Sequence, residues 1–304
     1  MSHLERRNQT GEGDFTSEPL RLKGRMLWLT KDPSLIRKQI EGEDLGFVPR
    51  EELLDWISTD QIIPSQWCMS FSDPENLSEY LLTGVGGINK GDIKGKFQGI
   101  GWGNSGGRGS SREHAQLAFK GAGVDFLIGD CERIFKENCH NYGIYTLNYE
   151  WDETVNLLSG KSMSIDELIA REDPLTREII RLGGLLTYTK ARIEGKVDIP
   201  EVTTPLRSMT IAEKIIAKHT RVAQTDSLGV TAVKPGDVLI AAVDKKYAYE
   251  LQTIISQQVL EETFGENASI KNQNTWLFED HLALMPDDMP VTIRHRDAQR
   301  AFAQ

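Results

Sequence analysis

The feature of this sequence that most restricts its fold is an alternation of apolar runs and helical patterns between residues 97 and 148. Three runs are short and mostly apolar, which is typical of buried strands: "FQGIG" (97–101), "VDFLIG" (124–129) and "IYTLN" (144–148). Apolar residues spaced by three and four predict a helix from about Ala115 to Ala122 and a second over 131–143. Strands that alternate with helices favour an α/β fold with parallel strand pairs.

A glycine-rich loop joins the first of these strands to the first helix, in the stretch "GNSGGRGSSREHA" (103–115). In parallel sheets, ligands bind where the carboxyl ends of strands meet the amino ends of helices, which is the position of this loop. Two interpretations are open. Ser110 and Glu113 fit a capping box, which would only start the helix. Alternatively, the N–H groups of the helix start, together with Arg112, bind a carboxylate or phosphate.

The remaining chain predicts further parts. Residues 1–20 are polar and predict a disordered tail ahead of a domain over 21–160. Residues 161–208 predict two short helices split at Pro174 and an extended linker. A second, smaller α/β domain follows over 209–304.

Four patterns define the expected second domain. Thr210 and Glu213 form a capping box ahead of a helix. The three others are a turn and strand in "VKPGDVLIAAVD" (233–244), a helix in "YAYELQTIISQQVLEETFG" (247–265) that ends before Gly265, and a strand in "TWLFED" (275–280).

Charge and cysteine usage exclude several classes of protein. With 45 acidic and 35 basic residues, the net charge of −10 argues against a broad nucleic-acid face. The sequence has no apolar stretch long enough for a membrane span and no apolar core in its first residues, so we expect a cytoplasmic protein. Cys68, Cys131 and Cys139 match neither a zinc site nor a disulfide framework, and without a CxxC we expect no metal site.

Three motifs carry a resemblance to a known family. "STDQIIPSQW" (58–67), "GRGSSREHA" (107–115) and "GVDFLIGDCERIFKENCHNYGI" (123–144) together resemble the swivel domain of the aconitase and isopropylmalate dehydratase family, equivalent to the dehydratase small subunit. "MTIAEKIIAKH" (209–219) and "VKPGDVLIAAVD" resemble the start of the large, iron-sulfur-bearing part. The resemblance implies a swivel-type β/β/α domain with parallel strands, followed by an incomplete α/β domain.

The resemblance also implies a reaction and the residues that perform it. Family members dehydrate and rehydrate a 2-hydroxy di- or tricarboxylic acid. By position, Ser110 would be the base, and Ser111, Arg112 and Gly109 would hold the substrate carboxylate. Asp60 is interpreted as mainly structural, because an Asp ahead of "IIP" also suits a turn, and His114 is likewise interpreted as structural.

The resemblance further implies a substrate preference at the segment after "IIP", since relatives that act on tricarboxylates have an Arg near that loop and dehydratases of branched substrates have apolar residues there. Trp67, Cys68 and Met69 offer no Arg there, which favours an apolar or unusual distal group on the substrate. Two alternatives stay open. The three residues belong to the core, or a cation comes from the nearby lysines Lys90, Lys94 and Lys96.

Family members hold a [4Fe-4S] cluster through three cysteines, and this chain lacks those cysteines. We therefore expect a cluster in the complete enzyme but none on this chain alone, with a cluster-bearing large domain or subunit as partner. Either the chain is truncated or a second chain supplies the cluster. The alternative function is a non-catalytic carboxylate-binding or assembly subunit with a swivel fold. RNA binding ranks last because of the negative charge.

Overall fold

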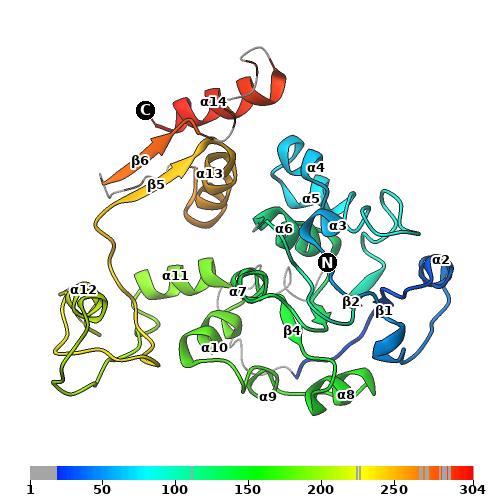
Figure 1. Cartoon of the computed structure of the whole chain (residues 1–304), viewed down its shortest axis with the longest axis horizontal. Helices are drawn as coiled ribbons and strands as arrows, with labels where there is room; N and C mark the ends of the chain where they lie inside the picture. Colours follow the sequence, from blue (N-terminus) through cyan, green and yellow to red (C-terminus); the bar gives the residue numbers. More distant parts are fainter. Residues whose placement is uncertain are drawn as a thin grey trace. The chain divides into compact units, whose positions relative to one another are not determined.

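The computed structural model of the chain describes residues 19–110, 112–223, 225, 227–266, 270, 274–280, 282, 286 and 289–303. These residues form two compact units (Figure 1), one up to Leu185 except for 173–175, and one that holds 173–175 and the chain from Leu186. Most of the predicted tail, residues 1–18, lies outside the described residues. Leu20, at its end, is buried and exchanges two backbone hydrogen bonds with Met163.

The first unit is built on a four-stranded sheet in the order β1-β2-β3-β4, with every neighbouring pair parallel. Its strands are β1 (Arg25–Trp28), β2 (Phe97–Gly101), β3 (Phe126–Ile128) and β4 (Tyr145–Leu147). The predictions for β2, β3 and β4 are confirmed, whereas the sequence analysis did not assign β1. Glycine in β2 has a packing reason, because a Cβ at Gly101 would lie 2.3 Å from the ring of Trp28 on β1.

Helices connect these strands, as parallel pairing requires. The helical elements of this unit are α2 (Pro33–Glu41), η1 (Arg50–Glu52), α3 (Thr59–Ile62), α4 (Ser65–Ser70), α5 (Pro74–Ser78), α6 (Glu113–Ala122), α7 (Arg133–Asn141), α8 (Asp152–Leu158), α9 (Ile165–Leu168) and α10 (Pro174–Arg181). The helices predicted on either side of β3 are therefore confirmed as α6 and α7. The apolar residues whose spacing predicted α6 are all buried: Ala115, Ala118, Phe119 and Ala122. The helix ends at Gly123, whose φ of +81° favours glycine.

The strands lie in the core of the unit. Trp28, Phe126, Ile128, Tyr145 and Leu147 are all buried and belong to one apolar cluster. Because the sheet is buried, its strands fix the positions of the loops that leave their carboxyl ends. The glycine-rich loop leaves β2 at that edge.

The second unit contains a separate two-stranded parallel sheet. Its elements are α11 (Leu185–Ile193), α12 (Ile211–His219), β5 (Lys246–Tyr249), α13 (Glu250–Phe264), β6 (Thr275–Phe278) and α14 (Pro290–Phe302). The capping box at α12 is confirmed, since Thr210 Oγ1 accepts from the N–H of Glu213 and the Glu213 carboxylate accepts from the N–H of Thr210. The predicted end of α13 at Gly265 is also confirmed.

Two predictions in this unit are wrong. The expected strand in 233–244 is reduced to one antiparallel bridge between Ala241 and Thr220, flanked by backbone hydrogen bonds from Arg221 to the Ile240 carbonyl and from Ala242 to the His219 carbonyl. The predicted helix begins three residues later than expected. Residues 247–249 extend as part of β5, because they pair with β6.

Among the described residues, no helix combines the length and apolarity that crossing a membrane requires.

Candidate functional site

The glycine loop (residues 103–110) is fixed between two distant segments of the first unit. On one side the N–H of Gly107 donates to the carbonyl of Ile57 at 2.7 Å. On the other side the N–H of Gly106 donates to the carbonyl of Asp130, also at 2.7 Å. These backbone bonds bring the segment before α3 and the segment after β3 against the loop.

Close packing explains a glycine within this loop. A Cβ at Gly107 would lie 2.0 Å from Cγ of Phe135 on α7, and the backbone there has a φ of +82°. Both conditions exclude other side chains. The loop backbone therefore lies directly on the Phe135 ring.

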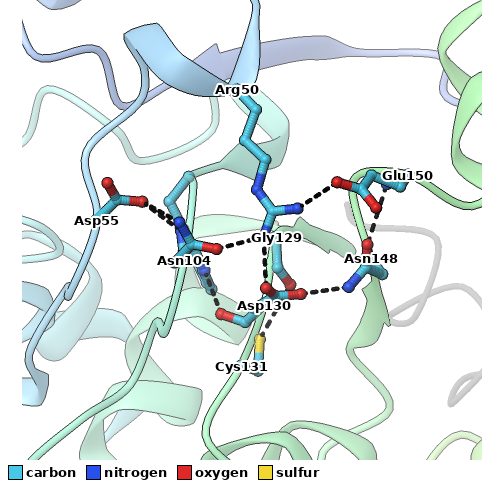
Figure 2. A network of polar contacts seen from close by, with 9 residues as sticks. Arg50, Asp55, Asn104, Gly129, Asp130, Cys131, Asn148 and Glu150 are labelled. Carbon is cyan, nitrogen blue, oxygen red and sulfur yellow. Dashed lines mark hydrogen bonds and ion pairs between the residues drawn. The ribbon is translucent and has the colours of Figure 1, made fainter.

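A polar network holds the loops at the carboxyl edge of the sheet (Figure 2). Arg50 in η1 points toward the Asp130 carboxylate, with Nη2 2.5 Å from Oδ2, and its Nη1 donates to Glu150 at 2.7 Å. Arg50 also donates to the side chain of Asn104, and Asn148 donates to Asp130. One guanidinium thus joins the loops that follow β2, β3 and β4.

The start of α6 differs from the predicted capping box. The N-cap residue is Arg112, which makes no side-chain capping bond, and Glu113 is the first helical residue. Ser110 therefore precedes the cap position by two residues, and the capping-box prediction for Ser110 and Glu113 is wrong. The reason is tertiary: Arg108 pairs with Ser58, and Gly109 has a φ of +99°, which delays the helical conformation.

Because no side chain caps α6, backbone N–H groups at its start remain without acceptors among the described residues. The backbone N–H groups of Gly109, Ser110 and Glu113 have no acceptor within the described part of the chain. Helix amino ends with such donors attract anions. Ser110 is exposed and Ser111 lies outside the described residues.

Arg112 is held by the segment that carries the "STDQIIP" motif. Its Nη1 donates to Oδ1 of Asp60 at 2.6 Å, and the Arg112 side chain is only 18% exposed. The guanidinium also lies near the Cys68 thiol. Burial raises the pKa of Cys68 to about 11, and the charge of Arg112 opposes that rise only in part.

The structure places the predicted specificity residues on α4. Trp67 is stacked on Tyr80 with 3.8 Å between ring centroids, and both rings stack with Phe71. Cys68 is buried and Met69 is partly buried. Cys68 interacts with the predicted anchor, Arg112.

The nearby lysines are engaged elsewhere. Lys90 lies over the ring of Tyr80, 4.8 Å from its centroid, and Lys94 pairs with Glu79 at 2.9 Å and also with Glu75. Lys96 is exposed.

A cleft of about 660 Å³ lies between the glycine loop and α7. Its lining includes residues from α3, the loop, α6 and α7: Thr59, Gly107, Arg108, Gly109, Arg112, Gln116, Glu132, Arg133, Ile134, Phe135, Glu137 and Asn138. The cleft thus brings together two of the predicted site residues, Gly109 and Arg112. It does not include Ser110 or the residues of α4.

The described residues do not fit an iron-sulfur cluster. No group of three or more His, Cys, Asp or Glu side chains among them is arranged to hold a metal ion. A cysteine ligates metal as the thiolate. Burial raises the pKa of Cys131 to about 12 and that of Cys139 well above its usual value, so both remain thiols at neutral pH.

Comparison with known proteins agrees with this geometry. The Aconitase C-terminal domain family matches residues 100–152, which contain the glycine loop, α6, β3, α7 and β4. The 3-isopropylmalate dehydratase small subunit of Aliarcobacter butzleri is 32% identical over 161 residues, which make up 46% of this chain and 92% of that subunit. The chain belongs to the family of isopropylmalate dehydratase small subunits.

Further members show the same extent of similarity. The isopropylmalate/citramalate isomerase small subunit of Methanocaldococcus jannaschii is 32% identical over 156 residues, 45% of this chain and 89% of that protein. A crystal structure of 3-isopropylmalate dehydratase from the same organism is 28% identical, covers 47% of this chain and 92% of that one, and has a TM-score of 0.38. Slightly less than half of this chain thus accounts for nearly all of each small subunit.

The sequence analysis of this chain did not identify all of the residues that line the cleft or hold its loops. It singled out neither Thr59 nor Gln116, and it did not find Arg50. A signal for Gln116 was present, because this polar residue lies between Ala115 and Leu117 in a helix whose neighbouring positions are apolar. No sequence pattern marks Arg50, whose partners come from three separate loops.

Proposed function

We propose that this chain supplies the base and the carboxylate anchor of an aconitase-like hydro-lyase, which acts on a 2-hydroxy di- or tricarboxylic acid. Membership of the small-subunit family supports this function. The observation that carries it is the uncapped start of α6, where backbone N–H groups lack acceptors among the described residues and the N-cap residue is Arg112. Donors at a helix start and a guanidinium together suit a carboxylate.

Arg112 is the anchor in this proposal. Its Nη1 donates to Asp60 at 2.6 Å and to the Ile63 carbonyl at 3.5 Å, and the guanidinium also interacts with the Cys68 thiol. A guanidinium carries five N–H donors, so it can hold a planar carboxylate in addition to these partners. Asp60 holds the guanidinium in position for this contact.

Ser110 is the proposed base. Its side chain is exposed two residues before the N-cap residue of α6, and Arg108 and Arg112 lie two residues to either side of it in the sequence. Positive charge lowers the free energy of an alkoxide relative to the hydroxyl. Ser110 Oγ would take the proton from the carbon next to the bound carboxylate and return it in the reverse step.

The Lewis acid of the family reaction belongs to a partner in this proposal, because the described cysteines do not form a cluster site. We assign residues 21–160 to the swivel domain and 209–304 to an incomplete beginning of the large part. The cluster then comes from a large domain or subunit that pairs with this chain, as the small-subunit relatives imply by their names.

The test combines the chain with a reconstituted, cluster-bearing large subunit of an isopropylmalate dehydratase. Dehydration of the hydroxy acid is followed by the absorbance of the double bond formed. We expect turnover with the unchanged chain and none with Ser110→Ala, while carboxylate binding by Ser110→Ala persists. Turnover retained in Ser110→Ala would remove Ser110 from the mechanism.

One observation favours a second candidate function, a non-catalytic carboxylate-binding or assembly subunit. The charge of Arg112 is already paired with Asp60, as in a purely structural ion pair. In that case the cluster-bearing subunit binds this chain but gives no turnover. Retained binding without turnover in the same experiment selects this alternative.

A further inference from the structure

Two buried polar side chains on the wall of the cleft have unpaired oxygen atoms. Thr59 is 2% exposed and Gln116 is fully buried. Neither Thr59 Oγ1 nor Gln116 Oε1 has a hydrogen-bond partner among the residues that the structure describes. Buried polar atoms in folded proteins are almost always paired, because an unpaired one loses its bonds to water without compensation. Two such atoms on one cleft wall indicate that a bound group satisfies them.

Both side chains flank the proposed carboxylate anchor. Gln116 lies in the first turns of α6, four residues after the N-cap residue Arg112. Thr59 lies on the other side, with Oγ1 3.5 Å from the position that a Cβ would take at Gly109. All four residues line the cleft. The two residues that bear the unpaired atoms therefore line the same cleft as the proposed anchor.

The amide of Gln116 can serve either a donor or an acceptor. Its Nε2 contacts only the Cys139 sulfur, at 3.9 Å, which is a weak partner. Turning the amide about its last bond exchanges Oε1 and Nε2 at the cleft. Nε2 would then donate to a carboxylate, together with the Thr59 hydroxyl.

The residues of α7 that line the cleft include an apolar ring and charged side chains. Phe135 is 4% exposed and supports the backbone at Gly107. The cationic Arg133 lies at the start of α7 and pairs with Glu137 at 2.9 Å. The part of the cleft lined by α7 thus contains charged side chains beside a packed ring.

We propose that Thr59 and Gln116 form a specificity subsite for a second carboxymethyl arm of the substrate, the arm that citrate carries where 2-isopropylmalate has an isopropyl group. This inference rests on the proposed function and adds the residues that select between substrates. It differs from the sequence-based expectation that Trp67, Cys68 and Met69 select an apolar distal group. A polar subsite rejects an apolar arm because the arm would leave the buried polar atoms unpaired.

The test uses two ligands that differ in one substituent. Citrate and 2-isopropylmalate share the carbinol carbon, its carboxylate and one carboxymethyl arm, and differ by a second carboxymethyl arm against an isopropyl group. Isothermal titration calorimetry on the full chain measures both affinities. We expect citrate to bind at least about tenfold more tightly. Gln116→Leu and Thr59→Val should each lower citrate affinity about five- to tenfold and leave 2-isopropylmalate within about twofold.

Controls distinguish a failure of this inference from a failure of the proposed function. Gln257→Leu, on α13, should change neither affinity. Gln116→Leu should not lower the urea midpoint of the free chain, since it removes an unpaired buried atom. Equal affinities in the unchanged chain, or an unchanged citrate affinity in Gln116→Leu, would overturn the subsite while leaving the anchor in place. If Arg112→Ala weakens neither ligand, or neither ligand binds, the proposed function itself fails.

Discussion

The Asp60 carboxylate accepts a hydrogen bond from Nη1 of Arg112 at 2.6 Å, although 52 residues of chain separate the two. Asp60 lies in the first turn of α3, whose own capping box uses Ser58 and Gln61, so its side chain is not needed to start that helix. The side chain of Asp60 is 61% exposed, whereas that of Arg112 is 18% exposed. Asp60 therefore orients the guanidinium of Arg112, which is more buried than Asp60. Its negative charge also offsets the positive charge of that guanidinium.

Orientation of Arg112 by Asp60 favours carboxylate binding, whereas the negative charge of Asp60 opposes it. Two substitutions separate these effects. Asp60→Asn keeps an oxygen that can accept from Arg112 but removes the charge. We expect carboxylate affinity to rise about three- to fivefold at low salt, with the gain reduced at high salt. Asp60→Ala removes orientation as well, and we expect affinity to fall below that of Asp60→Asn. Calorimetry with citrate measures both. Identical behaviour of the two variants would contradict the orienting role.

Close packing of the glycine loop on α7 gives a stability prediction. Gly107→Ala places a Cβ 2.0 Å from Phe135 at a φ of +82°, and we expect it to lower the free energy of unfolding by about 2 to 4 kcal/mol. Gly123→Ala is the matched control, since its φ is +81° and nothing lies within 4 Å of the new atom. We expect a loss of about 1 kcal/mol there. Urea unfolding compares the two, and equal losses would show that contact with Phe135 contributes nothing.

Local patterns in the sequence predicted the elements that depend on local physics. Apolar spacing gave β2, α6, β3, α7 and β4. The capping box at Thr210 was also found, because its partners are three residues apart and compete with no tertiary contact. The same motif failed at Ser110. There the neighbouring residue Arg108 is bound by the segment before α3, which single-sequence reasoning cannot place beside it.

The same distinction between local and tertiary determinants applies to the residues of the candidate site. The glycine loop and Arg112 follow from sequence because consecutive residues carry the chemistry. Thr59 lies about 50 residues from the loop, and the "STDQIIPSQW" motif that contains it does not by itself place its side chain on the cleft. The expected specificity residue Trp67 instead stacks on Tyr80, a contact that depends on how α4 is placed.

The Arg50 network predicts a stability loss that a surface pair would not show. Arg50→Ala leaves Asp130 and Glu150 without their cation and removes the connection to Asn104. We expect the free energy of unfolding to fall by about 1 to 3 kcal/mol. Arg133→Ala is the control, because that side chain is 89% exposed and forms a pair within one helix. Its removal should change stability by less than about 0.5 kcal/mol. Equal effects in denaturant unfolding would contradict the structural role of the network.

His219 gives the second unit a dependence on pH. Its pKa is raised by the bond between Nδ1 and the Ile215 carbonyl and, second, by Asp244, which lies 3.1 Å from Nε2. A raised pKa means that the folded state favours the protonated form. This stabilisation is fully present below the ordinary pKa of about 6.5 and is lost as pH rises through the higher folded value.

We therefore expect the thermal midpoint of the second unit to fall as pH rises from about 6 to about 8. His219→Gln should remove this part of the pH dependence, and Asp244→Asn should reduce it. Circular dichroism melts at several pH values measure the change. A midpoint that rises over this range in the unchanged chain, but not in His219→Gln, would contradict the assignment.

The start of α6 allows a direct test of whether Ser110 stabilises the fold. Ser164 is a true cap in the same unit, since Oγ accepts from the N–H of Glu167 at 3.1 Å and the Glu167 carboxylate accepts from the N–H of Ser164 at 2.8 Å. We expect Ser164→Ala to lower the free energy of unfolding by about 1 kcal/mol. Ser110 precedes the cap residue Arg112 by two positions and is exposed, so Ser110→Ala should change stability by less than about 0.5 kcal/mol. Urea unfolding of both variants makes the comparison. A loss in Ser110→Ala as large as that in Ser164→Ala would restore the capping interpretation, whereas a neutral Ser110→Ala leaves its hydroxyl available for chemistry.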